Sequence, residues 1–165
     1  MPPFEHQRHK PPQELLAPRE LIVAVPEMQS HVNLSRILRA AGCCGVRQVL
    51  AEGNARPDPK IARDALEVVQ LKVHRSLTPA IQALREEGHT IVGLEQATNS
   101  IPLPDYAFPQ KSLLLVGHER HGMSADWLAL CDAVVEIPIY GRPHSFNAAT
   151  SAAIAMYEYC RQWPH

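Results

Sequence analysis

Two arginines and one asparagine lie close together in the segment HVNLSRILRAA, residues 31–41. The apolar residues of this segment recur with the 3.6-residue period of a helix, for which Asn33 is a good N-cap. On that helix Arg36 and Arg39 lie one turn apart. Two neighbouring guanidinium groups suit contacts with phosphate or ribose. The alternative is a capped helix that carries two solvated arginines.

A second polar segment, VGHERHGMS (residues 116–124), follows the most apolar run of the chain, Leu113–Val116. Gly117 would let a ligand approach the backbone closely. Glu119 could orient a positive group or accept a hydrogen bond. The alternative is an ordinary polar turn in which Ser124 caps the next helix.

The third polar segment, GRPHSFN (residues 141–147), joins a β-rich run to a long alanine-rich helix. Asn147 can cap that helix. Ser145 beside His144 has the residue types of a nucleophile and its base, but neighbouring residues rarely form a working pair, and the chain has no GxSxG elbow. A hydrolase therefore stays an alternative, and the segment needs another explanation.

Strands alternate with helices along the chain, which predicts an α/β fold with a mostly parallel sheet flanked by helices. The expected strands cover residues 21–25, 46–51, 67–74, 90–94, 113–116 and 134–137. The expected helices cover residues 33–42, 59–66, 78–87, 125–130 and 147–161. In such folds ligands bind at the carboxyl ends of the strands, where all three polar segments lie. Neither GxGxxG nor GxxxxGK[ST] occurs, so a dinucleotide site or a P-loop is unsupported.

Composition and charge narrow the class further. The 165 residues, 45% of them hydrophobic, suit one domain, and the net charge is −1. Residues 31–75 nevertheless carry eight Lys or Arg against four Asp or Glu, which indicates either a polyanion partner or a chance excess on a solvated face. The four cysteines lack the spacing of metal ligands. We expect free thiols in a reducing cytosol, and no metal.

The first residues of the chain differ in composition from the rest. Residues 1–18 are rich in proline and charge, which predicts a flexible arm before a domain formed by residues 19–165. The arm lacks the apolar core of a secretory signal, and no apolar run approaches membrane-spanning length. We therefore expect a soluble, cytoplasmic protein.

Taken in order, the three polar segments resemble the motifs of the SpoU (TrmH) family, which are RNA 2′-O-ribose methyltransferases of the SPOUT class. That family shows an Asn…Arg-Ala motif, then G-N-E-x-x-G after a strand, then I-P-x-x-G…S-L-N-V opening the last helix. The matching stretches here are NLSRILRA, LLLVGHERHG and EIPIYGRPHSFN, and TIVGLEQATNS resembles the family's G-x-E-Q segment. The resemblance covers residues 20–162. His118 stands where the family usually has Asn, and Phe146 where it has Leu.

The resemblance implies a deep trefoil knot at the carboxyl end of the sheet, whose loops bind S-adenosylmethionine (SAM). The positions carried over for cofactor contacts are Leu94, Gly117, Ile137 and Phe146. Those carried over for catalysis are Asn33, Arg39, Glu119, Ser145 and Asn147. RNA contacts are expected from Arg36 and Arg39.

The function implied is methyl transfer to a ribose 2′-hydroxyl of RNA. A guanosine in the D-loop of tRNA is the favoured target, and rRNA is the next. The family also implies a homodimer in which each active site is completed across the interface. The alternative is an inactive knotted protein that binds RNA or acts as a scaffold.

Overall fold

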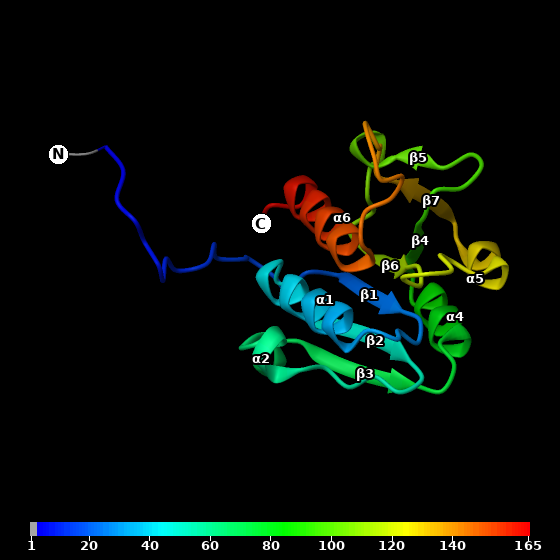
Figure 1. Cartoon of the computed structure of the whole chain (residues 1–165), viewed down its shortest axis with the longest axis horizontal. Helices are drawn as coiled ribbons and strands as arrows, with labels where there is room; N and C mark the ends of the chain where they lie inside the picture. Colours follow the sequence, from blue (N-terminus) through cyan, green and yellow to red (C-terminus); the bar gives the residue numbers. More distant parts are fainter. Residues whose placement is uncertain (1–2) are drawn as a thin grey trace.

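The computed structural model describes residues 3–165, and its centre is a seven-stranded sheet (Figure 1). The strands are β1 (Leu21–Val25), β2 (Gln48–Glu52), β3 (Gln70–His74), β4 (Thr90–Leu94), β5 (Ile101–Pro102), β6 (Ser112–Val116) and β7 (Ala133–Glu136). They lie in the order β3-β2-β1-β6-β4-β7-β5, and all neighbouring strands pair in parallel. The predicted α/β fold with a mostly parallel sheet is confirmed.

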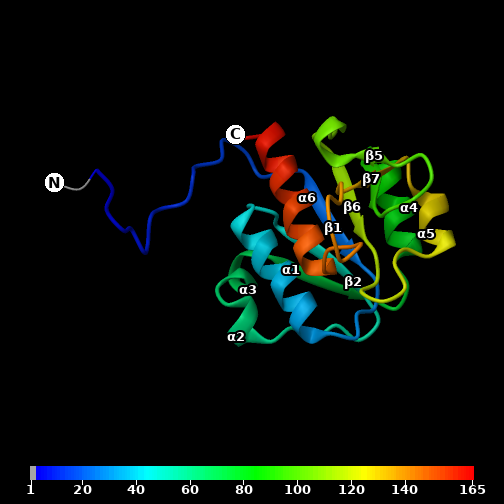
Figure 2. The ribbon, with the colours of Figure 1, turned by 45° about the horizontal axis from the view of Figure 1, so that its top comes forward.

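Helices cover both faces of this sheet (Figures 1 and 2). They are α1 (His31–Cys43), α2 (Pro59–Ala62), α3 (Ala65–Val68), α4 (Thr78–Glu86), the short 3-10 helix η1 (Leu103–Asp105), α5 (Ala125–Leu130) and α6 (Ala148–Gln162). Side chains alternate along a strand, so Leu114 and Val116 pack in the core under α1 and α6, while Leu113 and Leu115 pack in the core under α4 and α5. Burial on both faces explains why β6 is apolar throughout.

Helices α1 and α6 lie side by side on one face of the sheet (Figure 2). Ala152 and Ala155 of α6 are completely buried. Their small side chains let the two helix backbones approach closely, so the alanine-rich pattern serves packing within the chain. The pair matters for function because both helices begin near the polar segments that follow the strands.

The structure corrects several details of the sequence-based expectations. Helix α1 is capped by Ser30, whose hydroxyl accepts the backbone N–H of Asn33, so the prediction that Asn33 is the N-cap was wrong. The expected helix 59–66 is two short helices, because Arg63 between them adopts the left-handed φ of 55°. Strand β5 was not predicted: it has only two residues, one of them proline, and so shows no period.

The segment before β1 has no helix or strand over residues 3–20 and leads away from the domain (Figure 1). At its end, the Arg19 guanidinium donates to the carbonyl of Cys44 at 2.7 Å and to that of Trp163. The flexibility of the arm stays a prediction, and its residues 1 and 2 lie outside the described part. Within residues 3–165, no helix combines the length and the apolar character that crossing a membrane requires.

Candidate functional site

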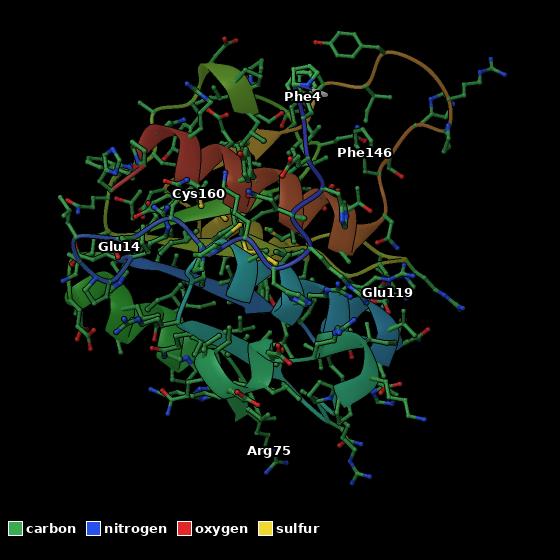
Figure 3. All side chains as sticks on the ribbon, turned by 90° about the vertical axis from the view of Figure 1, so that its left-hand side faces the viewer. Phe4, Glu14, Arg75, Glu119, Phe146 and Cys160 are labelled. Atoms are coloured by element: carbon green, nitrogen blue, oxygen red, sulfur yellow. The ribbon has the colours of Figure 1, made fainter. Side chains whose placement is uncertain are left out.

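A pocket of about 350 Å³ opens at the carboxyl ends of β4, β6 and β7. Figure 3 labels two of its lining residues, Glu119 and Phe146, from different segments. The pocket is lined by Leu94, Glu95, Gln96, Val116, Gly117, His118, Glu119, Arg120, His121, Gly122, Glu136, Ile137, Ile139, Ser145, Phe146, Ala148 and Ser151. All four positions expected to contact a cofactor are among them, as are two of the five expected to be catalytic.

The wall formed by residues 117–122 is a tight hairpin loop. His118 and Gly122 pair in antiparallel fashion, with N–O distances of 2.9 and 3.0 Å in the two directions. Gly122 has a φ of +67°, which favours glycine. A Cβ on Gly122 would also lie only 2.6 Å from a carboxylate oxygen of Glu95. Both the backbone conformation and this close contact therefore disfavour a side chain at position 122.

Glu95, directly after β4, is the glutamate of the G-x-E-Q segment, for which the sequence predicted no role. Its Oε2 accepts the backbone N–H of Met123 at 2.7 Å and lies 3.0 Å from the position a Cβ would take on Gly117. The carboxylate is therefore wedged beside both glycines of the loop and fixes the loop against β4. Two glycines five residues apart signalled a close approach, but nothing in the sequence said which side chain approaches.

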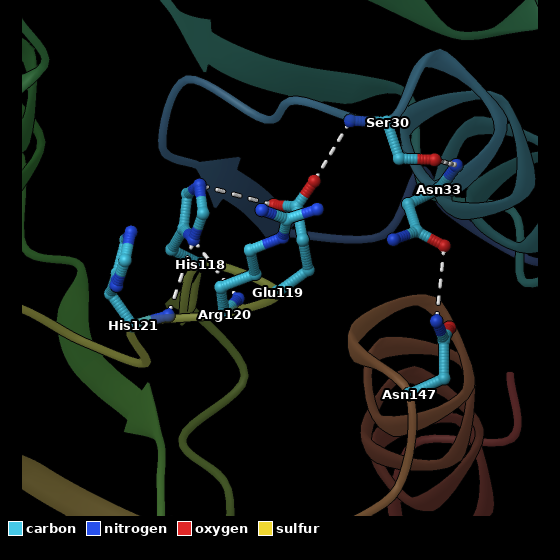
Figure 4. Close-up of polar contacts among 7 residues, drawn as sticks. All are labelled: Ser30, Asn33, His118, Glu119, Arg120, His121 and Asn147. Carbon is cyan, nitrogen blue, oxygen red and sulfur yellow. Dashed lines mark hydrogen bonds and ion pairs between the residues drawn. The ribbon is translucent and has the colours of Figure 1, made fainter.

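Polar contacts join the three predicted segments into one network (Figure 4). Glu119 Oε1 accepts the backbone N–H of Ser30 at 2.8 Å, which ties the hairpin loop to the start of α1. One turn into α1, Asn33 Oδ1 accepts the Nδ2 of Asn147 at 3.1 Å. Asn147 in turn caps α6, as predicted, because its Oδ1 accepts the N–H groups of Ala149 and Thr150.

The ionised form of Glu119 is stabilised by this network. Burial acts most strongly and would raise the pKa of Glu119, but its bonds to backbone N–H groups, among them that of Ser30, and the adjacent His118 together hold that pKa below its usual value. Asn33 is 7% exposed, whereas its hydrogen-bond partner Asn147 is exposed, so the contact between the two side-chain amides lies at the edge of the core. A carboxylate and two amides thus stand in fixed positions where the loop and both helices meet.

Arg36 and Arg39 lie apart from this network. Both are exposed on α1, neither lines the pocket, and within residues 3–165 neither makes a hydrogen bond or an ion pair. Ser145 does line the pocket, and the carbonyl of its neighbour His144 accepts from Gln96 at 3.1 Å. Nothing in the described chain joins the Ser145 hydroxyl to the His144 ring, so a hydrolase pair gains no support.

Across residues 3–165, no three or more His, Cys, Asp and Glu side chains gather closely enough to hold a metal ion. The site therefore consists of a cradle with apolar and acidic walls, a network of amides and carboxylates beside it, and two free guanidinium groups further along α1.

A family model described as the SpoU rRNA Methylase family matches residues 20–157 of this sequence. The chain belongs to this family. The match contains β1 to β7 and most of α6, and so includes each segment that lines the pocket.

Three relatives show how the family resemblance is distributed. The tRNA (guanosine(18)-2′-O)-methyltransferase of Escherichia coli is 29% identical over 154 residues, or 90% of this chain and 67% of that protein. Mouse tRNA (guanosine(18)-2′-O)-methyltransferase TARBP1 is 44% identical over 82 residues, which are 50% of this chain and 5% of that protein. The crystal structure of the SpoU methyltransferase AviRb from Streptomyces viridochromogenes, in complex with the cofactor AdoMet, superposes with a TM-score of 0.75 at 30% identity, covering 88% of this chain and 59% of that one.

The chain spans only part of these proteins, from 5% of mouse TARBP1 to 67% of the Escherichia coli enzyme. The shared part is the SpoU domain, so the fold and family carry over directly. What the longer relatives act on is a property of those proteins.

Proposed function

We propose that this protein transfers a methyl group from SAM to a ribose 2′-hydroxyl of RNA, with a guanosine in the tRNA D-loop as the first candidate and rRNA as the second. The observation that carries the proposal is the pocket: it lies where the strands end, the second and third motif segments line it, and the start of the first segment bonds to both of them. Two relatives named for guanosine 18 of tRNA support the choice of target.

The residues present fit SAM. Those proposed to hold it are Leu94, Gly117, Ile137 and Phe146, all of which line the pocket. A Cβ on Gly117 would crowd the backbone of Gly122 at 3.0 Å, so the cradle is shaped by backbone there. Apolar walls beside the carboxylates of Glu95 and Glu136 suit a ligand with a flat apolar part and a positive centre. When bound, SAM supplies a methyl group that its sulfonium already activates.

The chain between β7 and α6 forms, in this proposal, the last crossing of a deep trefoil knot. Five residues of this stretch line the same pocket as the ends of β4 and β6, namely Ile137, Ile139, Ser145, Phe146 and Ala148, and α6 then packs against α1 near the beginning of the chain. Such an arrangement brings backbone from three distant segments around one ligand. Knots are rare, so family membership is the main support for this one.

The protein's task in catalysis is to position the ribose and to help its hydroxyl lose a proton, since a free hydroxyl is a poor nucleophile. Arg39 binds the substrate phosphate and stabilises charge that develops on the 2′-oxygen. A guanidinium resists deprotonation, so it acts as a fixed cation. Asn33 orients the ribose or Arg39, and a wider network of Glu119, Ser145 and Asn147 holds them in place.

RNA binding is assigned to the exposed cations of the basic segment. Arg36, Arg39, Arg56, Lys60 and Arg63 are all exposed on or near α1 and α2. The loop before α2 is fixed to α1, because the buried Ser35 hydroxyl accepts the backbone N–H of Asp58 at 2.7 Å. Each phosphate contact releases counterions, so we expect RNA affinity to fall steeply as salt rises.

A homodimer explains why Arg39 stands outside the pocket of its own chain: Arg39 of a second copy would complete each site. A large apolar groove beside the pocket suits that second copy. Its lining includes Leu103, Pro104, Tyr140, Ile154 and Tyr157, and it shares Ile137 and Phe146 with the pocket. Tyr140 is 96% exposed and Tyr157 70% exposed, which is unusual for large aromatic side chains unless a partner covers them.

Mixing two inactive variants tests the shared site. Arg39→Ala keeps its pocket and Gly117→Val keeps its arginine, so a mixed dimer contains one complete site if the arginine acts on the partner's pocket. We expect the mixture to regain activity that neither variant has alone. If both residues act within one chain, mixing restores nothing, and sedimentation analysis then shows whether the chain is a monomer.

A cytoplasmic location agrees with the free thiols of all four cysteines, a state that reducing compartments maintain. It is also where the RNA substrates proposed here would be processed.

The decisive experiment is mass spectrometry of nucleosides from tRNA and rRNA, comparing cells with and without the gene. Loss of one 2′-O-methylated nucleoside, restored by the wild-type gene and not by the Arg39→Ala variant, would establish both reaction and target. Calorimetry with SAM addresses the alternative of an inactive scaffold. A chain that binds RNA but not SAM would end the enzyme proposal.

A further inference from the structure

His118 stands at the base of the hairpin loop that forms one wall of the pocket, where it pairs with Gly122. Its ring Nδ1 accepts the backbone N–H of Arg120 at 3.0 Å and that of His121 at 3.3 Å. On the other side of the ring, Nε2 lies 3.4 Å from Glu119 Oε2. The side chains of His118 and Glu119 are only 14% and 11% exposed, so water does not readily replace these contacts.

These contacts define the protonation state of the ring. An imidazole nitrogen that accepts two N–H groups carries no proton, so the neutral ring has its proton on Nε2, on the side of the ring nearer Glu119. Glu119 passes the restraint on, because its other oxygen accepts the backbone N–H of Ser30 at the start of α1. The ring thus satisfies the donors of the turn and steadies the carboxylate that anchors the loop.

We propose that His118 is a positioning residue that shapes the pocket wall only while its ring is neutral, so that acid loosens this wall. A protonated ring has no acceptor left, and its Nδ1–H would face the two backbone N–H donors of Arg120 and His121. The cap is present above the pH at which the ring gains its proton, and it is lost below it. This inference rests on the proposed function only for its effect on SAM; the loop geometry stands without it.

Other charged and titratable groups around the ring shape this response. On the loop, the Glu119 carboxylate lies beside the ring, and the Arg120 cation follows it in the chain. His121 stacks on His118 with 4.8 Å between ring centroids, and two positive rings in that arrangement repel each other. From the adjoining strands, Glu95 of the β4 end and Glu136 of β7 line the same pocket and add negative charge.

The departure from the family pattern makes the proposal specific to this chain. The family usually has Asn at this position, and an asparagine carbonyl oxygen can accept backbone N–H groups of a following turn at any pH. Replacing His118 with Asn therefore separates two properties of the ring. Capping is retained by the amide, whereas sensitivity to acid belongs to the imidazole alone.

The test is amide hydrogen exchange of the backbone N–H groups of Arg120 and His121, measured by NMR on the full chain and corrected for the intrinsic effect of pH. The comparison is made at about pH 5 and about pH 8, either side of the range in which imidazoles titrate. We expect protection in the wild type to fall at least about fivefold at the lower pH, the factor that one modest hydrogen bond is worth. His118→Asn should show the same protection at both pH values.

Two outcomes would overturn the proposal. Equal protection of both N–H groups at the two pH values in the wild type would mean that the ring does not act as an acid-labile cap. Loss of the pH effect in His121→Gln, with its retention in His118→Asn, would assign the effect to the stacked neighbour. The exchange readout needs no SAM, so a failure of the proposed function leaves it intact.

Calorimetry then connects the loop to the cofactor. We expect SAM affinity of the wild type to weaken between about pH 8 and about pH 5 by the same factor as the protection, and that of His118→Asn to stay constant. A wild-type affinity that does not change while the loop opens would show that the loop does not hold SAM. No SAM binding at either pH would reject the proposed function and not the cap.

Discussion

Helices α1 and α6 lie side by side and run in the same direction, yet the two ends of the pair use polar groups in opposite ways. At their first turns, Asn33 and Asn147 bond to each other beside the pocket. At their last turns, the Arg19 guanidinium binds the carbonyls of Cys44 and Trp163. Figure 3 separates the two ends: Glu119 and Phe146 are labelled on one side of the molecule, and Cys160 on the other.

At the end near Cys160, polar groups find their hydrogen-bond partners within the chain. Tyr159 is 1% exposed, donates its hydroxyl to the carbonyl of Gln110 at 2.5 Å and packs edge-on against Phe108. Burial raises the pKa of Tyr159 to about 12, so the hydroxyl remains a donor at any physiological pH. Polar groups that bond to the backbone inside a packed core stabilise the fold, and they have no donor or acceptor left to bind a substrate.

At the end near the pocket, some polar groups lack hydrogen-bond partners within the described chain. Ser145 is exposed and lines the pocket, and its hydroxyl has no hydrogen-bond partner within residues 3–165. One buried oxygen of Glu119 has no hydrogen-bond donor within the described chain, apart from the His118 ring at 3.4 Å. The comparison shows that the end near Cys160 is distinguished by tight packing around paired polar groups. The end near the pocket is distinguished by polar groups that lack hydrogen-bond partners, as expected of a functional site.

The largest effect is expected from Arg39→Ala. Removing the guanidinium should lower methyl transfer at least about a hundredfold, because the proposed mechanism requires its fixed charge beside the reacting oxygen. SAM affinity by calorimetry should stay within about twofold, since Arg39 does not line the pocket. Arg36→Ala, one turn earlier and equally exposed, is the matched control and should weaken RNA binding only. Wild-type turnover in Arg39→Ala would remove the guanidinium from the mechanism.

Substitutions at the end near Cys160 should change the free energy of unfolding and leave SAM binding unchanged. Tyr159→Ala should reduce the free energy of unfolding by about 3–5 kcal/mol, the usual cost of deleting a buried aromatic ring. Tyr159→Phe removes only the bond to Gln110 and should cost about 1 kcal/mol. Urea denaturation gives both values, and SAM affinity of the folded fraction should be unchanged. A selective loss of SAM binding in Tyr159→Phe would contradict the division between the two ends.

The hydrogen bond between the side chains of Asn33 and Asn147, here called the amide bridge, should contribute to both stability and activity. Asn33→Ala removes the bridge but leaves the α6 cap, so we expect at most about 1 kcal/mol lost in unfolding, with a fall in methyl transfer of about tenfold or more. Asn147→Ala also removes the cap and should cost about 1 kcal/mol more. Thr150→Ala in the same first turn serves as the control. Equal activity in Asn33→Ala and wild type would make the bridge purely structural.

The smallest functional effect is expected at Cys160, where only reactivity should change with pH. A hydrogen bond from the Cys44 thiol, followed in strength by the opposing effect of burial and the attraction of Arg19, lowers the pKa of Cys160 to about 7. Burial and Asp132 raise that of Cys131 to about 11. Since the thiolate is the nucleophile, alkylation of Cys160 should rise as pH increases through about 7 and outpace that of Cys131 near pH 8.

Mass spectrometry of a Cys43→Ser variant, which lacks the exposed thiol, gives the two rates separately. Alkylated Cys160 should leave SAM affinity unchanged, because the residue lies at the far end of the helix pair. A loss of SAM binding on alkylation would show that the two ends communicate.

Much of the scaffold followed from the sequence because local chemistry decides it. Thr90–Leu94 and Ala125–Leu130 have the predicted bounds, since an apolar run between breakers and a serine-capped helix carry their own signals. The family resemblance also identified Leu94, Gly117, Ile137 and Phe146, which the structure places around one pocket. Their roles toward SAM and RNA stay predictions.

What the sequence by itself determined is the alternation of strands and helices, the parallel sheet and the family, because periodicity, caps and motif spacing are properties of neighbouring residues. Only the tertiary structure decided that Glu95 wedges against Gly122, that Asn33 bonds Asn147 instead of capping α1, and that Arg39 stands apart from its own pocket. Glu95 and Gly122 are 27 positions apart in the sequence, and Asn33 and Asn147 are 114 positions apart. The place of Arg39 depends on which face of α1 stays uncovered. Local residue preferences contain no information about such partners, since they are chosen when the sheet closes and the helices pack.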